Sequence, residues 1–71
     1  MPRVIRLFQV KNFIDEAQSA KIIRKLCSLD GIINAQADAS SGVIEIEYEN
    51  ALIDRYVIQE ELSKIGFDML I

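Results

Sequence analysis

The sequence predicts a single α+β domain over residues 1–71, in which a four-stranded antiparallel sheet carries two helices on one face. Three observations lead to this fold class. The chain has 71 residues, enough for one domain, and 51% of them are hydrophobic, too many for a disordered segment. Hydrophobic patterns typical of strands and helices follow in the order strand, helix, strand, strand, helix, strand. The two halves of that order also repeat each other.

The internal repeat relates five apolar residues of the first half to five of the second, each 36 positions later. The pairs are Phe8 and Ile44, Val10 and Ile46, Ile22 and Ile58, Leu26 and Leu62, and Leu29 and Ile65. Such matching indicates two βαβ units related by a pseudo-twofold axis, and right-handed crossovers then leave few topologies. We therefore expect a ferredoxin-like βαββαβ sandwich with strand order 4-1-3-2.

In the first half, residues 3–10 are rich in β-branched and aromatic side chains and predict a strand. A helix is expected over residues 15–29, because its apolar residues recur at helical spacing. The Asp30-Gly31 pair ends this helix, since glycine readily takes the left-handed conformation of a C-cap. A short, weaker strand follows over residues 32–37.

The second half begins after a turn cluster at residues 38–42. Residues 43–49 alternate between apolar side chains and glutamates, which predicts a half-buried strand. Asp54 is expected to cap a second helix over residues 55–65, and Gly66 to end it. Residues 67–71 are expected to form the last strand.

The helices leave the other face of the sheet open. Alternation along the strands directs Phe8 and Val10 inward and four aliphatic residues outward. These four are Ile5, Leu7, Val43 and Leu70. Together they are a candidate contact surface, for self-association or for a partner protein. The alternative is that they are the scattered apolar residues found on any protein surface.

Composition excludes several functions. A net charge of −3 argues against nonspecific binding to nucleic acid or to anionic membranes. With one cysteine and no histidine, the chain can form neither an internal disulfide nor a Cys/His zinc site, and it lacks the usual general base of enzymes. No apolar run is long enough to insert in a membrane, and Arg3, Arg6 and Gln9 interrupt any signal peptide, so we expect a non-enzymatic cytoplasmic protein.

The framework of the sequence resembles the heavy-metal-associated domain. The residues that carry the resemblance are Ile22, Leu26, Leu29-Asp30-Gly31-Ile32, Ala35, Ala37, the run from Gly42 to Glu49, Ile58, Leu62 and Ile65-Gly66-Phe67. This family comprises small copper chaperones, mercury-binding proteins and N-terminal modules of metal-transporting P-type ATPases. The resemblance implies the same βαββαβ fold and a place in metal transport.

The chemical signature of that family is absent. Its members carry a Met-Thr-Cys-x-x-Cys loop before the first helix, whose two thiolates bind soft ions such as Cu(I). The resemblance places this loop at residues 13–18, with Phe13 at the methionine position and Asp15 and Gln18 at the two cysteine positions. We therefore expect no bound metal and no cofactor.

The replacement has a structural interpretation. Asp15 and Gln18 have the spacing of a capping box. In this motif the Asp15 carboxylate accepts from the amide three residues later, and the Gln18 side chain accepts from the Asp15 amide. The alternative is a site for a hard cation built from Asp15, Glu16 and Gln18, although these supply few of the oxygens that Ca²⁺ requires.

Three further features are weaker candidates. Cys27 can act as a redox or metal-relay thiol if neighbouring Arg24 and Lys25 lower its pKa. The simpler interpretation is that Cys27 only packs on the flank of the helix, because the chain has no second cysteine to react with it. Two charged surfaces can select a partner or can simply be solvated. They are the acidic residues Glu45, Glu47 and Glu49 and the basic residues Lys21, Arg24 and Lys25.

Our leading hypothesis is a degenerate heavy-metal-associated-like domain that has lost soft-metal binding and acts as a protein-interaction or regulatory module. The second is a metal chaperone or an ATPase N-terminal domain that uses nonstandard ligands. The third is a small-molecule-binding regulatory domain, because such sites leave little trace in a sequence.

Overall fold

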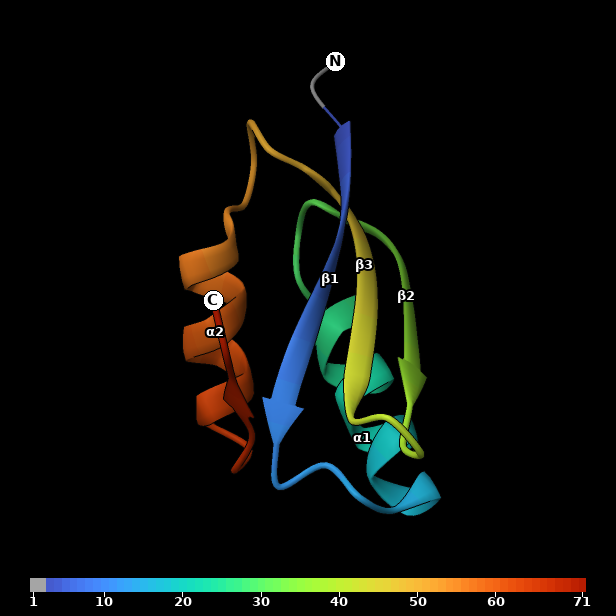
Figure 1. Cartoon of the computed structure of the whole chain (residues 1–71). Coiled ribbons are helices and arrows are strands. Elements are labelled where there is room, and N and C mark those ends of the chain that lie inside the picture. The colour runs from blue at the N-terminus through green and yellow to red at the C-terminus, as the bar shows by residue number, and fades with distance from the viewer. Residues whose placement is uncertain (1–2) are drawn as a thin grey trace.

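The computed structural model describes residues 3–71. Six elements follow one another along the chain, as Figure 1 shows. They are β1 (Arg3–Lys11), α1 (Glu16–Cys27), β2 (Ile32–Asp38), β3 (Val43–Glu49), α2 (Arg55–Ser63) and β4 (Asp68–Met69). The strands form one antiparallel sheet in the order β2-β3-β1-β4. The predicted fold class and the predicted strand order are therefore confirmed.

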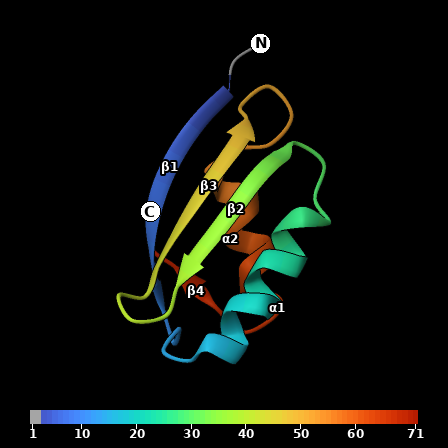
Figure 2. The same cartoon turned by 90° about the vertical axis from the view of Figure 1, so that its right-hand side faces the viewer.

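Both helices pack on the same face of the sheet (Figure 2). The core lies between these two layers and is built from the inward side chains that the strand and helix patterns predicted. Its fully buried members include Ile22 and Leu26 of α1, Ile44 and Ile46 of β3, and the repeat partners Ile58 and Leu62 of α2. The repeat in the sequence therefore reflects equivalent packing positions in the two βαβ halves.

Both helices end earlier than expected. α1 ends at Cys27 and not at residue 29, because the Ser28 hydroxyl donates a hydrogen bond to the Lys25 carbonyl at 2.6 Å and closes the last turn. α2 ends at Ser63 and not at residue 65. There the amides of Gly66 and Phe67 donate to the carbonyls of Ser63 and Leu62, which is the Schellman arrangement. Leu29 and Ile65 still pack against the core from the turns that follow.

The last strand is also shorter than the expected residues 67–71. Only Asp68 and Met69 pair with β1, opposite Lys11 and Val10. Phe67 turns into the core, where its ring meets that of Phe13 edge to face with centroids 6.5 Å apart. Burial of this ring therefore replaces strand pairing at the start of the segment.

No helix among residues 3–71 is both long enough and apolar enough to cross a membrane.

Candidate functional site

The loop between β1 and α1 is the first candidate site, because the resemblance places the metal-binding motif there. Asn12 takes a left-handed conformation, with φ of 66°, and turns the chain out of β1. Phe13 then points inward and is only 2% exposed, whereas Ile14 stands at the tip of the loop and is 85% exposed. One aromatic residue therefore anchors the loop to the core.

Asp15 and Gln18 close this loop by hydrogen bonds. The Asp15 carboxylate accepts from the amide of Ala17 at 3.0 Å. The Gln18 side-chain oxygen accepts from two amides, those of Ile14 at 2.9 Å and Asp15 at 3.1 Å. The predicted capping box is confirmed. It satisfies amides at the start of α1 that would otherwise lack a partner inside the helix.

The side chains of this loop do not fit a soft metal ion. Cu(I) prefers thiolate or thioether ligands, and the loop offers oxygen donors that already accept amide protons. Cys27 is exposed at the opposite end of α1, about 18 Å from Asp15 at 1.5 Å per residue. Across residues 3–71, no three Asp, Glu, Cys or His side chains gather closely enough to hold a metal ion.

The outer face of the sheet is the second candidate site. Ile5 is 56% exposed, Leu7 is 66% exposed and Leu70 is 41% exposed, while Val43 is partly buried. The strand register shows how they are arranged. On β3, Glu47 lies opposite Ile5 and Glu45 lies opposite Leu7. Each of these two aliphatic side chains therefore has an acidic side chain as its direct cross-strand neighbour.

Leu7 is the centre of this aliphatic group. Val43 lies opposite Gln9, two positions along β1 from Leu7, and the Leu70 amide donates to the Gln9 carbonyl at 2.8 Å from the other side. Diagonal neighbours on antiparallel strands lie about 7–8 Å apart, within reach of long side chains. Val43 and Leu70 therefore flank Leu7 diagonally, with Ile5 beside it on the same face of β1.

Gln9 is a residue of this face that the sequence analysis did not single out. Its side-chain amide donates to the carbonyls of Ser41 at 3.0 Å and Gly42 at 3.3 Å, so it holds the β2–β3 turn against β1. In that turn, hydrogen bonds from the Ser40 hydroxyl and amide and from the Ser41 hydroxyl lower the pKa of Asp38. The turn is therefore ordered around a charged carboxylate.

Within residues 3–71, three ion pairs neutralise part of the charge on the outer face and on the helices. Arg3 bonds Glu47 at 2.8 Å, which neutralises one acid of the outer face. On the helices, Glu61 pairs with both Lys64 at 2.9 Å and Lys25 at 3.1 Å. Hydrogen bonds from Lys64 and then from Lys25 lower the pKa of Glu61, and the pKa of Lys64 is raised in return. The predicted basic group on α1 is thus partly engaged within the domain.

Solved structures of low sequence identity share this architecture. The CopZ metallochaperone superposes with a TM-score of 0.88 at 13% identity, over 94% of this chain and 100% of that one. Oxidised MerP from Ralstonia metallidurans CH34 gives 0.90 at 7% identity, over 96% of this chain and 94% of that one. The chain has the heavy-metal-associated fold.

A third neighbour extends the heavy-metal-associated fold to transporters. It is the Cu(I)-loaded N-terminal domain of a potential copper-translocating P-type ATPase from Bacillus subtilis, with a TM-score of 0.87 at 19% identity over 97% of this chain and 85% of that one. No family model matches the sequence, and no curated protein matches it. At these low sequence identities, the structural similarity shows only the fold. The function must be inferred from the side chains of this chain.

Proposed function

We propose that this chain is a degenerate heavy-metal-associated domain, linked to metal transport, that does not bind soft metals and acts as a protein-interaction or regulatory module. It is non-catalytic and works in the cytoplasm, where Cys27 stays a free thiol. One observation carries the proposal. At the loop where the resemblance expects two thiolates, Asp15 and Gln18 are engaged in a capping box.

The fold neighbours support the link to metal transport. They include a metallochaperone and the N-terminal domain of a potential copper-translocating P-type ATPase. The exposed group of Ile5, Leu7, Val43 and Leu70 supports an interaction role, because it lies on the face that neither helix covers. We assign the contact with a second copy or with a partner domain to this aliphatic group.

The metal part of the proposal is tested by competition for Cu(I) against a chelating indicator under reducing conditions. We expect the wild-type chain to bind Cu(I) no better than a lone surface thiol, and the Cys27→Ser variant not to bind it at all. Stoichiometric, tight capture by Cys27→Ser would contradict the proposal and favour a metal chaperone with nonstandard ligands.

A gain-of-function variant serves as the positive control. Asp15→Cys combined with Gln18→Cys restores the Cys-x-x-Cys spacing at the start of α1, where the positive end of the helix dipole favours thiolates. We expect this double variant to bind one Cu(I) per chain. Failure to bind would mean that the loop no longer has the shape that the resemblance assigns to residues 13–18.

A further inference from the structure

Two depressions of opposite charge lie on the two layers of the molecule. The first lies where α1 faces the end of α2, and its volume is about 510 Å³. It is lined by Lys21, Arg24, Lys25 and Ser28, which recur at helical spacing along α1 and its C-cap, and by Ile65 after α2. This basic groove combines positive charges with an aliphatic side chain, and the residues of 3–71 that line it include no acid.

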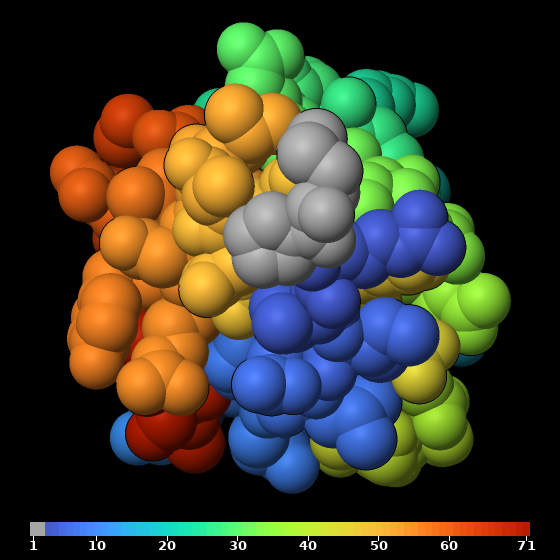
Figure 3. All heavy atoms as spheres, turned by 90° about the horizontal axis from the view of Figure 1, so that it is seen from above, coloured from blue at the N-terminus to red at the C-terminus, as the bar shows by residue number. Residues whose placement is uncertain are grey.

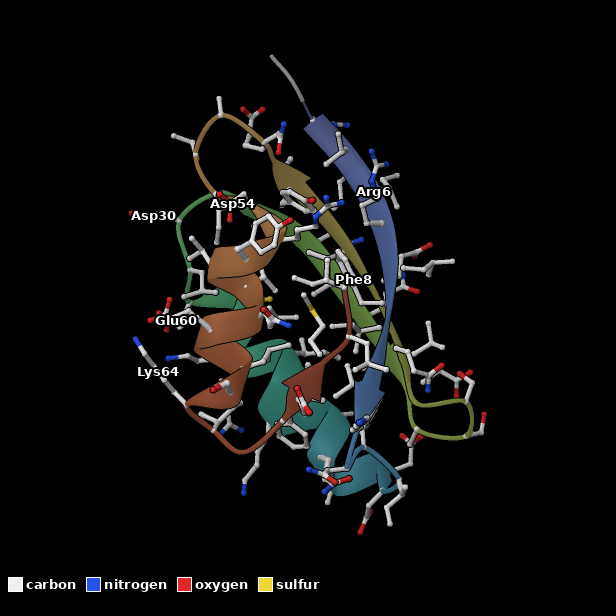
Figure 4. All side chains as sticks on the ribbon, turned by 60° about the vertical axis from the view of Figure 1, so that its left-hand side comes forward. Arg6, Phe8, Asp30, Asp54, Glu60 and Lys64 are labelled. Carbon is white, nitrogen blue, oxygen red and sulfur yellow. The ribbon has the colours of Figure 1, made fainter. Side chains whose placement is uncertain are left out.

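The acids beside the basic groove lie on α2 and are shared with Lys64. Glu61 pairs with Lys25 at 3.1 Å and with Lys64 at 2.9 Å, so one carboxylate serves two ammonium groups. Glu60 adds a further attraction to Lys64. Figure 4 shows Glu60 and Lys64 on the side of α2 that points away from the sheet. These acids therefore neutralise the α2 side of the groove and only Lys25 on its α1 side.

Lys21 and Arg24 carry the remaining positive charge of the basic groove. Neither residue takes part in the ion pairs formed within residues 3–71. Both side chains are exposed, and they lie on the same side of α1 because they are three positions apart. Their charged ends can therefore bond carboxylates of another molecule without breaking an ion pair inside the domain.

The second depression lies on the outer face of the sheet, beside Leu7. Its volume is about 260 Å³, and its lining residues include the acids Asp38 and Glu45 and the aliphatic residues Leu7 and Val43. Among residues 3–71, no basic side chain lines this acidic depression. Leu7 and Glu45 are direct cross-strand neighbours, so an exposed aliphatic side chain and a carboxylate stand together at its rim.

The basic residues of the outer face lie beside other acids of that face. Arg3 bonds Glu47 at 2.8 Å, and Lys11 lies opposite Asp68 on β4. Glu45 takes part in none of the ion pairs formed within residues 3–71. The acidic depression therefore keeps the negative charge of Glu45 available to a partner.

We propose that the acidic depression of one chain docks on the basic groove of a second copy. The two carboxylates of the depression bond Lys21 and Arg24 of the second copy, and Leu7 covers its Ile65. The occupant is a second copy because every chain carries both complementary surfaces. The contact rests on the proposed function, which assigns self-association to the aliphatic group around Leu7, and it names the surface that receives this group.

This contact joins two different surfaces and is therefore heterologous. Seen from above in Figure 3, atoms of β1 (blue) and β2 (light green) lie on one side of the molecule and those of α2 (orange) on the other. After one contact forms, each chain still has one surface free, so further copies can add by the same contact. A symmetric contact between two outer faces would instead stop at a dimer.

Amide chemical shifts of ¹⁵N-labelled protein, recorded at concentrations up to the millimolar range, locate the contact. We expect concentration-dependent shifts at two separate places, around Leu7 and Glu45 on the sheet and around Arg24 and Ser28 on α1. We also expect the molar mass from light scattering to pass that of a dimer. Shifts confined to the outer face would overturn the proposal in favour of a symmetric dimer.

Charge reversal tests whether the basic groove receives the outer face. Arg24→Glu should weaken self-association by about tenfold, since it reverses one charge at the contact. The matched control is Arg55→Glu, which makes the same change of net charge at the start of α2, outside the groove, and should leave self-association unchanged. Adding Glu45→Lys to Arg24→Glu exchanges the two charges across the contact. This double variant should associate again, which a misfolded Arg24→Glu chain could not explain.

Three further results would overturn the proposal. They are equal effects of Arg24→Glu and Arg55→Glu, no recovery of association in the double variant, and no concentration-dependent shift in the millimolar range. Failure of the proposed function is distinguishable from these results. The Cu(I) titration tests its metal part without any self-association, and an outer-face contact that Arg24→Glu leaves intact would retain its interaction role.

Discussion

At the scale of single residues, Asp15 shows how one carboxylate can organise the start of a helix. A carboxylate at an N-cap accepts amide hydrogen bonds and also lies at the positive end of the helix dipole. Asp54 does the same at α2, where it accepts from the Val57 amide at 3.0 Å. Both helices therefore begin with an aspartate N-cap.

Asp15→Ala should lower the free energy of unfolding by about 0.5–2 kcal/mol, because the Ala17 amide loses its acceptor. Denaturant unfolding measures the change, with Asp54→Ala as the counterpart expected to cost a similar amount. A neutral Asp15→Ala beside a destabilising Asp54→Ala would show that Asp15 does not cap α1 in solution.

Glu61 gives the domain a defined response to acid. The pKa of Glu61 is lowered in the folded state because its carboxylate pairs with Lys64 and Lys25. These ion pairs therefore stabilise the fold fully at pH values above the ordinary glutamate pKa of 4.5. As the pH falls through the folded-state pKa, that contribution is lost. The stability difference between wild type and Glu61→Gln should therefore shrink on acidification. Glu60→Gln, at a neighbouring position of α2, should show a smaller difference at neutral pH.

At the scale of elements, the turn after each helix contains one glycine with a left-handed backbone. Gly31 and Gly66 both take left-handed conformations, with φ of 97° and 92°. Their surroundings differ. A Cβ at Gly31 would lie 2.8 Å from Cγ2 of Ile53 and 3.0 Å from Cβ of Leu52, whereas a Cβ at Gly66 would meet no atom within 4 Å.

These two glycines form a matched pair for substitution. Gly66→Ala should cost about 1–2 kcal/mol, which is the left-handed backbone penalty alone. Gly31→Ala should cost about 1–3 kcal/mol more, because the β3–α2 loop must also move. Thermal or denaturant unfolding of both variants checks this order. Equal destabilisation would mean that the loop yields freely to the added methyl group.

At the scale of the whole molecule, the two faces of the sheet have different roles. Both helices cover the inner face, which carries the core (Figures 1 and 2). The outer face exposes the aliphatic group, which lies among Gln9, Glu45 and Glu47. Burying one large aliphatic side chain contributes about 1.5–3 kcal/mol, so a symmetric set can hold a weak dimer. The Arg3–Glu47 pair reduces the repulsion that two acidic faces would otherwise experience.

We expect the molar mass from light scattering to rise with protein concentration, or the outer face to bind a separate partner domain. Leu7→Lys should abolish either contact, because Leu7 is at the centre of the aliphatic group. Leu52→Lys is the matched control, since Leu52 is 67% exposed against 66% for Leu7 but lies in the β3–α2 loop. If the native chain stays monomeric at every concentration and no partner contacts this face, the aliphatic group is ordinary surface.

The sequence by itself determined the fold, because the signals that specify it are local and periodic. Apolar residues at helical and strand spacing and the capping residues Asp15 and Asp54 act within a few turns or along one strand, and the constant 36-residue offset shows that the same local pattern occurs twice. The same locality predicted the capping box. It predicted element ends less well, since Ser28 and Phe67 owe their positions to hydrogen bonds and packing across turns.

Only the tertiary structure decided which residues lie side by side. The position of Leu7 between Val43 and Leu70, and the role of Gln9 in holding the β2–β3 turn, depend on strand register. Periodicity within one element carries no information about such contacts, since they arise from where separate elements meet in space.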